Sequence, residues 1–128
     1  MKKKQTVELP TRTNTLPFST GIIAEGRFLF VSGQGPWDPE RKTFVRGSIG
    51  EQTRLTLECI QRVVEAAGTT MENAVSCRVY LQQLTEITFS EMNDAYALFF
   101  GAEKPVRTTV GCQLLNIDVE IDCIFQIP

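Results

Sequence analysis

Histidine is absent from the 128 residues of this chain. Without histidine, there can be no Ser-His-Asp or Cys-His catalytic arrangement and no histidine-ligated metal. General acid–base chemistry must therefore come from Glu, Asp, Tyr, Lys, Cys or bound water. The spacing typical of a zinc site is also missing, because no CxxC pair occurs among Cys59, Cys77, Cys112 and Cys123. We expect reduced structural thiols and no metal ion.

Long apolar runs and a strong charge bias are missing too. No stretch approaches membrane-spanning length, and no apolar segment follows the first lysines, so we expect a cytoplasmic protein with no membrane partner. A net charge of −2, from 13 basic and 15 acidic residues, gives no electrostatic footprint for nucleic acid. The only basic run, Lys2-Lys3-Lys4, is expected to be a solvated, poorly ordered terminus.

The length and a hydrophobic content of 42% indicate one globular domain spanning residues 1–128. Residues 1–16 are polar, and we expect them to be irregular or partly disordered at their start. Segments 18–24 and 27–32 are predicted to be strands joined in a hairpin, because Gly26 can adopt the positive φ of a tight turn. A turn-rich loop follows at 33–39.

Two helices are predicted from capping patterns and apolar spacing. Ser48 and Glu51 form a capping-box pattern that opens a helix running to Ala67, with Gly68 as its stop. A strand is predicted over 74–81. A second capping-box pattern at 88–91 opens a short helix with an apolar stripe that ends at Gly101. We expect core positions for that stripe, which consists of Phe89, Met92, Tyr96, Phe99 and Phe100.

The last two predicted strands carry the groups most suited to chemistry. Alternation over 106–112 separates Arg107 and Thr109 from an apolar side, and alternation over 119–125 does the same for Glu120. A guanidinium and a carboxylate are therefore expected on one sheet face. The planar donors of Arg107 suit a substrate carboxylate or phosphate. On the alternation alone, a structural ion pair between Arg107 and Glu120 is the more common arrangement. The apolar strand sides also carry Cys77, Cys112 and Cys123.

The order strand, strand, helix, strand, helix, strand, strand predicts an α+β fold. Helical crossovers favour parallel neighbours, which places both helices on one face of a mixed sheet. The other face is then uncovered and can meet solvent or another subunit; we favour an oligomer with packed sheets. The residues expected on that face include Ser76, Arg78, Tyr80, Arg107, Thr109 and Glu120.

Several segments, in order and at matching spacing, resemble the RidA/YjgF family of imine deaminases from Pro17 onward. The segments that carry the resemblance are 16–19 (LPFS), 30–36 (FVSGQGP), 51–54 (EQTR), 65–68 (EAAG), 89–96 (FSEMNDAY), 104–110 (KPVRTTV) and 119–122 (VEID). Singly each match is weak, but jointly they are specific.

The resemblance implies a chorismate-mutase-like α+β homotrimer whose sheets line a central barrel, with active sites in clefts between subunits. It implies hydrolysis of 2-imino or enamine acids to 2-keto acids and ammonia, without a metal or organic cofactor. The implied role is removal of reactive intermediates before they damage other enzymes.

The resemblance also assigns roles to individual residues. Arg107 matches the carboxylate clamp, and Glu120 matches the acidic residue that positions or activates water. Ser32 and Gly33 match backbone that lines the pocket, and Asn93 matches a cleft residue that can equally be a helix-face hydrogen bonder. The chain departs from the family pattern at two substrate-binding positions, having Phe18 for the usual tyrosine and Thr109 where cysteine is frequent.

Other functions stay open. One is a deaminase for a related enamine such as 2-aminomuconate, and another is a trimeric protein that binds a ketoacid or other small carboxylate without catalysis. An RNase or translation inhibitor is disfavoured by the acidic balance, the missing histidines and the lack of a basic-aromatic surface.

Overall fold

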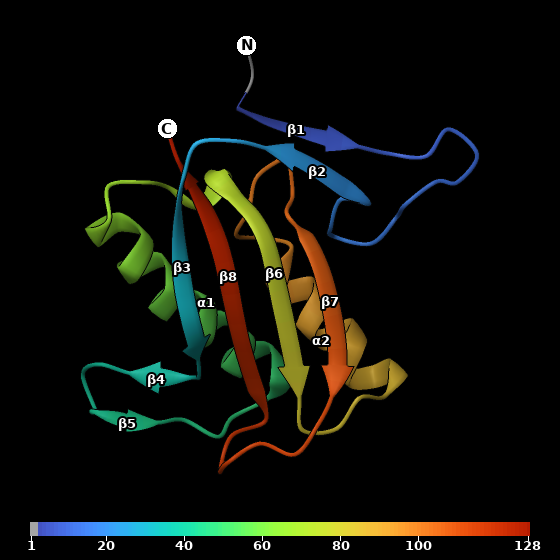
Figure 1. Ribbon diagram of the computed structural model, residues 1–128. Helices are drawn as coiled ribbons and strands as arrows, with labels where there is room; N and C mark the ends of the chain where they lie inside the picture. The colour runs from blue at the N-terminus through green and yellow to red at the C-terminus, as the bar shows by residue number, and fades with distance from the viewer. Residues whose placement is uncertain (1–2) are drawn as a thin grey trace.

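A four-stranded mixed sheet organises the chain in the computed structural model, which describes residues 3–128. Its strands are β3 (Arg27–Gln34), β6 (Ala74–Leu81), β7 (Val106–Gly111) and β8 (Val119–Ile127), in the order β3-β8-β6-β7. β8 runs antiparallel to both its neighbours, whereas β6 and β7 are parallel. Both helices lie behind this sheet, so the predicted α+β layering is confirmed (Figure 1).

Helix α1 (Ile49–Ala66) forms where its capping signal predicted. The Ser48 side chain accepts a hydrogen bond from the backbone N–H of Glu51, and Gly68 leaves the helix with φ +82°. The apolar stripe of α1 packs against β3 and β8 and buries Leu57 and Ile60 completely.

Helix α2 (Glu86–Tyr96) is shorter and earlier than predicted. Its N-cap is Thr85, whose side chain exchanges hydrogen bonds with Thr88, so the expected start at 88–91 is wrong. The first turn forms there because each threonine hydroxyl accepts a hydrogen bond from the backbone N–H of the other threonine. These N–H groups would otherwise lack a partner at the start of the helix. The helix ends at Tyr96, and Gly101 closes a following turn with φ +71°.

The amino-terminal segment differs from two predictions. A strand, β1 (Lys4–Val7), pairs antiparallel with β2 (Gly21–Ala24), so residues 4–7 are regular, and β2 does not form the expected hairpin with β3. Gly26 does adopt a positive φ of 115°, but there it passes the chain from one sheet to the other. The irregular part of the segment runs from residue 8 to residue 16.

The prediction that the lysine run is solvated is wrong for Lys4. Lys4 is buried, and its ammonium donates hydrogen bonds to the carbonyls of Glu72 at 2.7 Å and Glu103 at 2.6 Å. These bonds anchor β1 against the short 3-10 helix η1 (Met71–Asn73) and the loop before β7. Lys2 of the basic run lies outside the described residues. A small two-stranded ribbon, β4 (Trp37–Asp38) with β5 (Thr43–Phe44), completes the fold.

The strand register reverses the predicted face of Arg107. In the parallel pairing Arg107 lies opposite Cys77, and Cys77 lies opposite Cys123 on β8. All three side chains are buried on the helix-covered face. Glu120 lies opposite Tyr80 instead, on the open face. Arg107 and Thr109 therefore do not share a face with Glu120, as the alternation had suggested.

The open face of the sheet is partly apolar. Phe30 on β3 exposes 72% of its surface there, and it pairs with Ile124 on β8. Polar neighbours form a network in which Arg78 and Tyr80 donate hydrogen bonds to the Asp122 carboxylate at 2.8 and 3.0 Å. The open face therefore combines an exposed aromatic side chain with a polar network.

Candidate active site around a buried arginine

Arg107 is the centre of the candidate site. Its side chain is only 8% exposed, and its guanidinium carbon lies 4.8 to 5.5 Å from the centres of three aromatic rings. Tyr96 and Phe89 provide two rings from α2, and Phe18 provides the third from the loop before β2. Ring faces attract a cation and keep it charged where little water reaches. A further contact comes from the Sδ atom of Met92, which accepts from Nη1 at 3.7 Å.

No carboxylate neutralises this guanidinium within residues 3–128. Its Nε and Nη2 atoms are buried without a hydrogen-bond partner, which contradicts the structural ion pair with Glu120. Burial lowers the pKa of Arg107, and Tyr96 and Cys77 counter this in part. Arginine nevertheless stays protonated in proteins, so two strong donors remain unused. A buried charge with unused donors is the arrangement expected of an anion site.

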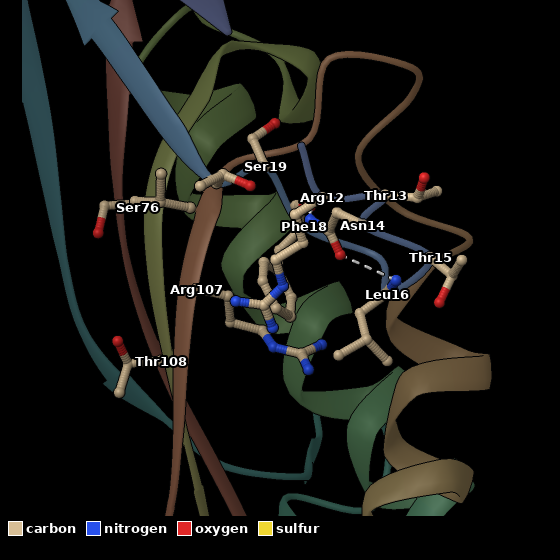
Figure 2. Close-up of a pocket in the computed structure, with 12 residues that line it drawn as sticks. Arg12, Thr13, Asn14, Thr15, Leu16, Phe18, Ser19, Ser76, Arg107 and Thr108 are labelled. Atoms are coloured by element: carbon tan, nitrogen blue, oxygen red, sulfur yellow. Dashed lines mark hydrogen bonds between the residues drawn. The ribbon is translucent and has the colours of Figure 1, made fainter. Parts of the chain in front are cut away.

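A cavity of about 360 Å³ gives access to Arg107, as Figure 2 shows. Phe18 lines this cavity as well as contacting the guanidinium. The loop that carries Phe18 is held by Asn14, which donates to the Phe18 carbonyl and accepts from the backbone N–H of Leu16 at 3.0 Å. A backbone hydrogen bond from Ser19 to the Pro105 carbonyl ties the loop to the start of β7.

A second cluster forms at the other side of the sheet. The register of β3 shifts between Val31 and Gln34, and this irregularity brings Gly33 against the Glu120 carboxylate. A methyl group at residue 33 would lie 2.5 Å from Oε2 of Glu120. Only glycine, which has no Cβ, leaves this carboxylate in place. Ser32 is exposed beside them. Thus Ser32, Gly33 and Glu120 lie together but apart from Arg107.

The two remaining predicted site residues also have unused polar atoms. Thr109 lies two residues beyond Arg107 on the same face of β7, and its hydroxyl is buried without a partner. Asn93 follows Met92 on α2, and its side-chain oxygen is buried without a partner. The Thr109 hydroxyl can donate to or accept from a ligand, whereas the Asn93 oxygen can only accept.

The sequence predicts core positions for Phe89, Met92 and Tyr96 and no contact with Arg107. They do pack in or against the core, but all three also contact Arg107. Their spacing of three and four residues predicts that they share one helix face. The sequence does not show that this helix face meets Arg107, because that depends on which sheet face Arg107 occupies. The hydroxyl of Tyr96 is buried without a partner, and burial raises its pKa well above the ordinary value of 10.0.

The cysteines behave mostly as expected. Cys77 and Cys123 are buried next to Arg107 and Tyr96, with their sulfur atoms 2.6 Å apart, whereas Cys112 is exposed, contrary to prediction. Cys112 follows the last residue of β7, so the alternation no longer applies to it. Between residues 3 and 128, no group of histidine, cysteine or acidic side chains is arranged for a metal ion. No helix in that range has the length and apolar character to cross a membrane.

Together, the fold and the site define an α+β domain with a buried cationic site at one edge of its sheet. The family model for Endoribonuclease L-PSP matches residues 11–127. A RutC family protein of Pyrococcus horikoshii is 42% identical over 106 residues, covering 83% of this chain and 82% of that protein. The chain therefore belongs to the Endoribonuclease L-PSP family, which is the RidA/YjgF family named by the sequence resemblance.

Solved structures agree with this assignment. A Yersinia pestis protein of the Rid family, of unknown function, matches with a TM-score of 0.88 over 98% of this chain and all of its own, at 22% identity. A Thermotoga maritima protein provisionally described as an endoribonuclease matches with a TM-score of 0.74 and 31% identity, covering 100% and 99% of the two chains. The first shows the fold alone, and the second also supports the family.

Proposed function

We propose that this protein hydrolyses 2-imino acids, or their enamine tautomers, to 2-keto acids and ammonia. The observation that supports this best is the buried Arg107 guanidinium, which has unused donors, no acidic neighbour and an open cavity beside it. A substrate carboxylate would accept the free Nε and Nη2 hydrogens as a fork. Little water competes at such a site, so the binding geometry is well defined.

The chemistry asks little more of the protein than positioning. Water adds to the imine carbon to give a carbinolamine; a proton moves to nitrogen; the C–N bond then breaks, releasing ammonia and leaving the keto acid. Glu120 is proposed to orient the attacking water and accept its proton. Because an imine is already electrophilic, orientation and charge stabilisation suffice without a metal or organic cofactor.

Arg107 and Glu120 lie on opposite faces of one sheet, so one chain does not unite them. β7, which carries Arg107, is one edge of the sheet, whereas Gly33 and Glu120 meet at the opposite edge, on β3 and β8. We therefore propose a homotrimer in which the Arg107 side of one subunit faces the Glu120 side of the next. The partly apolar open face would be buried in that trimer.

The activity is tested by measuring ammonia release from 2-iminobutyrate generated in situ by an amino acid oxidase. The wild-type protein should accelerate release, and Arg107→Met and Glu120→Gln should each lower the rate constant by about 100-fold or more. Arg27→Gln, which removes an exposed arginine on β3, is the matched control and should retain full activity. Equal rates with and without the wild-type protein would contradict the proposal.

The assembly is tested separately by light scattering. Phe30→Asp places a charge on the open face and should shift a trimer toward monomer. Ile87→Asp is a matched control, because Ile87 is also 72% exposed but lies on α2, away from that face. Equal effects of the two substitutions would contradict a trimer built on the open sheet face.

A ribonuclease is the second candidate, favoured by the family description and by the description of the Thermotoga maritima relative. Cleavage of a defined RNA by nuclease-free protein, lost in Arg107→Met, would select it. Ketoacid binding measured by calorimetry without faster imine hydrolysis would instead select a binding protein.

A further inference from the structure

The cavity beside Arg107 contains a second guanidinium. Arg12, from the loop between β1 and β2, lines the same 360 Å³ cavity, and Figure 2 shows its side chain extending toward that of Arg107. The twelve residues around the cavity include these two arginines, six serine or threonine residues and no aspartate or glutamate. The cavity is therefore positive and rich in hydrogen-bonding groups.

Arg12 is available to a ligand. It is exposed, and no ion pair to it occurs among the described salt bridges of residues 3–128. An acidic residue, Glu8, lines an adjoining cavity that Arg12 also lines. Its carboxylate is directed to Thr20: Oε1 accepts from the Thr20 backbone N–H at 3.0 Å and Oε2 accepts from the Thr20 hydroxyl.

Lys104 lines that adjoining cavity too. Its ammonium donates to the Gly101 carbonyl at 2.8 Å and adds a second positive charge to that cavity. The backbone that carries Arg12 is fixed at both ends: Arg12 N–H donates to the Leu9 carbonyl at 3.3 Å, and Asn14 holds the turn that follows. The backbone of Arg12 is thus held beside the cavity, and its side chain lines it.

We propose that the substrate of this site carries two carboxylates, one bound by Arg107 and the other by Arg12. This inference rests on the proposed function, since it assigns the reacting end of the substrate to Arg107. A single carboxylate would use the unpaired donors of Arg107 and leave Arg12 without an acceptor. A cavity of 360 Å³ has room for a dicarboxylic acid of five or six carbons.

Two ligands that differ only in the distal carboxylate test this directly. Calorimetry compares 2-oxoglutarate with 2-oxopentanoate, at low salt, for the wild-type chain, Arg12→Gln and the exposed-arginine control Arg27→Gln. Because Arg12 is exposed, its contribution to binding should equal that of a surface ion pair. The wild type and the Arg27→Gln control should therefore bind 2-oxoglutarate about fivefold more tightly than 2-oxopentanoate. Arg12→Gln should abolish this preference and leave 2-oxopentanoate affinity unchanged.

The preference should also shrink at 0.3 M salt, because exposed charges are screened. Equal affinity of the wild type for the two acids would overturn the proposal. Tighter binding of inorganic phosphate than of 2-oxoglutarate would also overturn it. So would an Arg12→Gln variant that loses affinity for both keto acids equally.

A rate measurement separates this inference from the proposed function. The imines of glutamate and norvaline, made by an amino acid oxidase, differ in the same way as the two keto acids. Faster ammonia release from both, with no preference for the dicarboxylate, would retain the proposed function and reject the second anion site. A 2-oxoglutarate preference in binding, with no acceleration of either imine, would retain the second site and reject the hydrolase.

Discussion

Replacing Arg107 with methionine should make the fold more stable while destroying the proposed anion site. In the free protein, two buried donors without acceptors cost about 2–6 kcal/mol together. Three cation–π contacts, at 4.8, 5.0 and 5.5 Å, offset roughly 1.5–3 kcal/mol of that cost. Methionine keeps most of the apolar stem among Phe18, Phe89 and Tyr96. We therefore expect Arg107→Met to raise the free energy of unfolding by about 1–2 kcal/mol.

Thermal and urea unfolding of the two proteins measure this difference. A gain of this size should raise Tm by about 3–6 °C in a domain of this length. Arg27→Met, the exposed control, should change stability by less than about 0.5 kcal/mol. Adding 2-oxobutyrate should raise Tm of the wild type but not of Arg107→Met, because only the former binds the anion. A loss of about 3 kcal/mol or more would refute the reasoning, since breaking a buried ion pair has that effect.

Three further predictions follow from single contacts. Gly33→Ala should displace the Glu120 carboxylate and lower the rate of imine hydrolysis about tenfold. Urea unfolding should be unchanged, because the displaced atoms are the flexible end of a side chain. The control Gly21→Ala, whose new methyl group meets only ordinary contacts, should leave activity intact. Tyr96→Phe should remove one part of the alkaline loss of stability. Because the pKa of Tyr96 is raised, the unfolded chain alone loses this proton above pH 10, so this residue lowers the wild-type free energy of unfolding by about 1.4 kcal/mol per pH unit there. The raised pKa of Cys123 adds a loss that both proteins share, so urea titrations at pH 9 to 11 should show a steeper fall for the wild type, and equal slopes would contradict this. Lys4→Met should cost about 1.5–3 kcal/mol in urea unfolding, because two backbone carbonyls lose a charged donor; an unchanged midpoint would show that β1 contributes nothing to stability.

The elements with local signals could be predicted from the sequence. Helix α1 follows from the Ser48 cap, the apolar spacing and Gly68, and strand β6 follows from alternation; both form where expected. Helix α2 begins earlier than the sequence predicts, because Thr88 and Glu91 match the common capping-box pattern whereas the actual cap, Thr85, has a threonine at that third position. Short elements such as β1 escaped prediction because pairing with a distant partner, and not propensity, stabilises them.

The sequence points to Arg107 as a candidate anion ligand but does not give its place in the fold. The hydrophobic alternation within β7 predicts the wrong sheet face for it. That alternation misleads here because Arg107 occupies the buried face, beside Cys77, while Val106 and Val110 lie on the open face. Only the parallel register with β6 fixes the orientation. The position of Arg12 beside the cavity has no local sequence signal, because a loop brings it there.

The central claim is that Arg107 of one subunit and Glu120 of the next form one active site, and mixing two inactive variants tests it most directly. Arg107→Met and Glu120→Gln are unfolded together in urea, refolded as a 1:1 mixture, and assayed for ammonia release from 2-iminobutyrate. Random reassembly of a cyclic trimer would restore about a quarter of the wild-type sites, with both residues intact at those interfaces. Recovery of about a quarter of the wild-type activity is the predicted result. A mixture as inactive as its two components, although reassembled as trimers, would contradict the account.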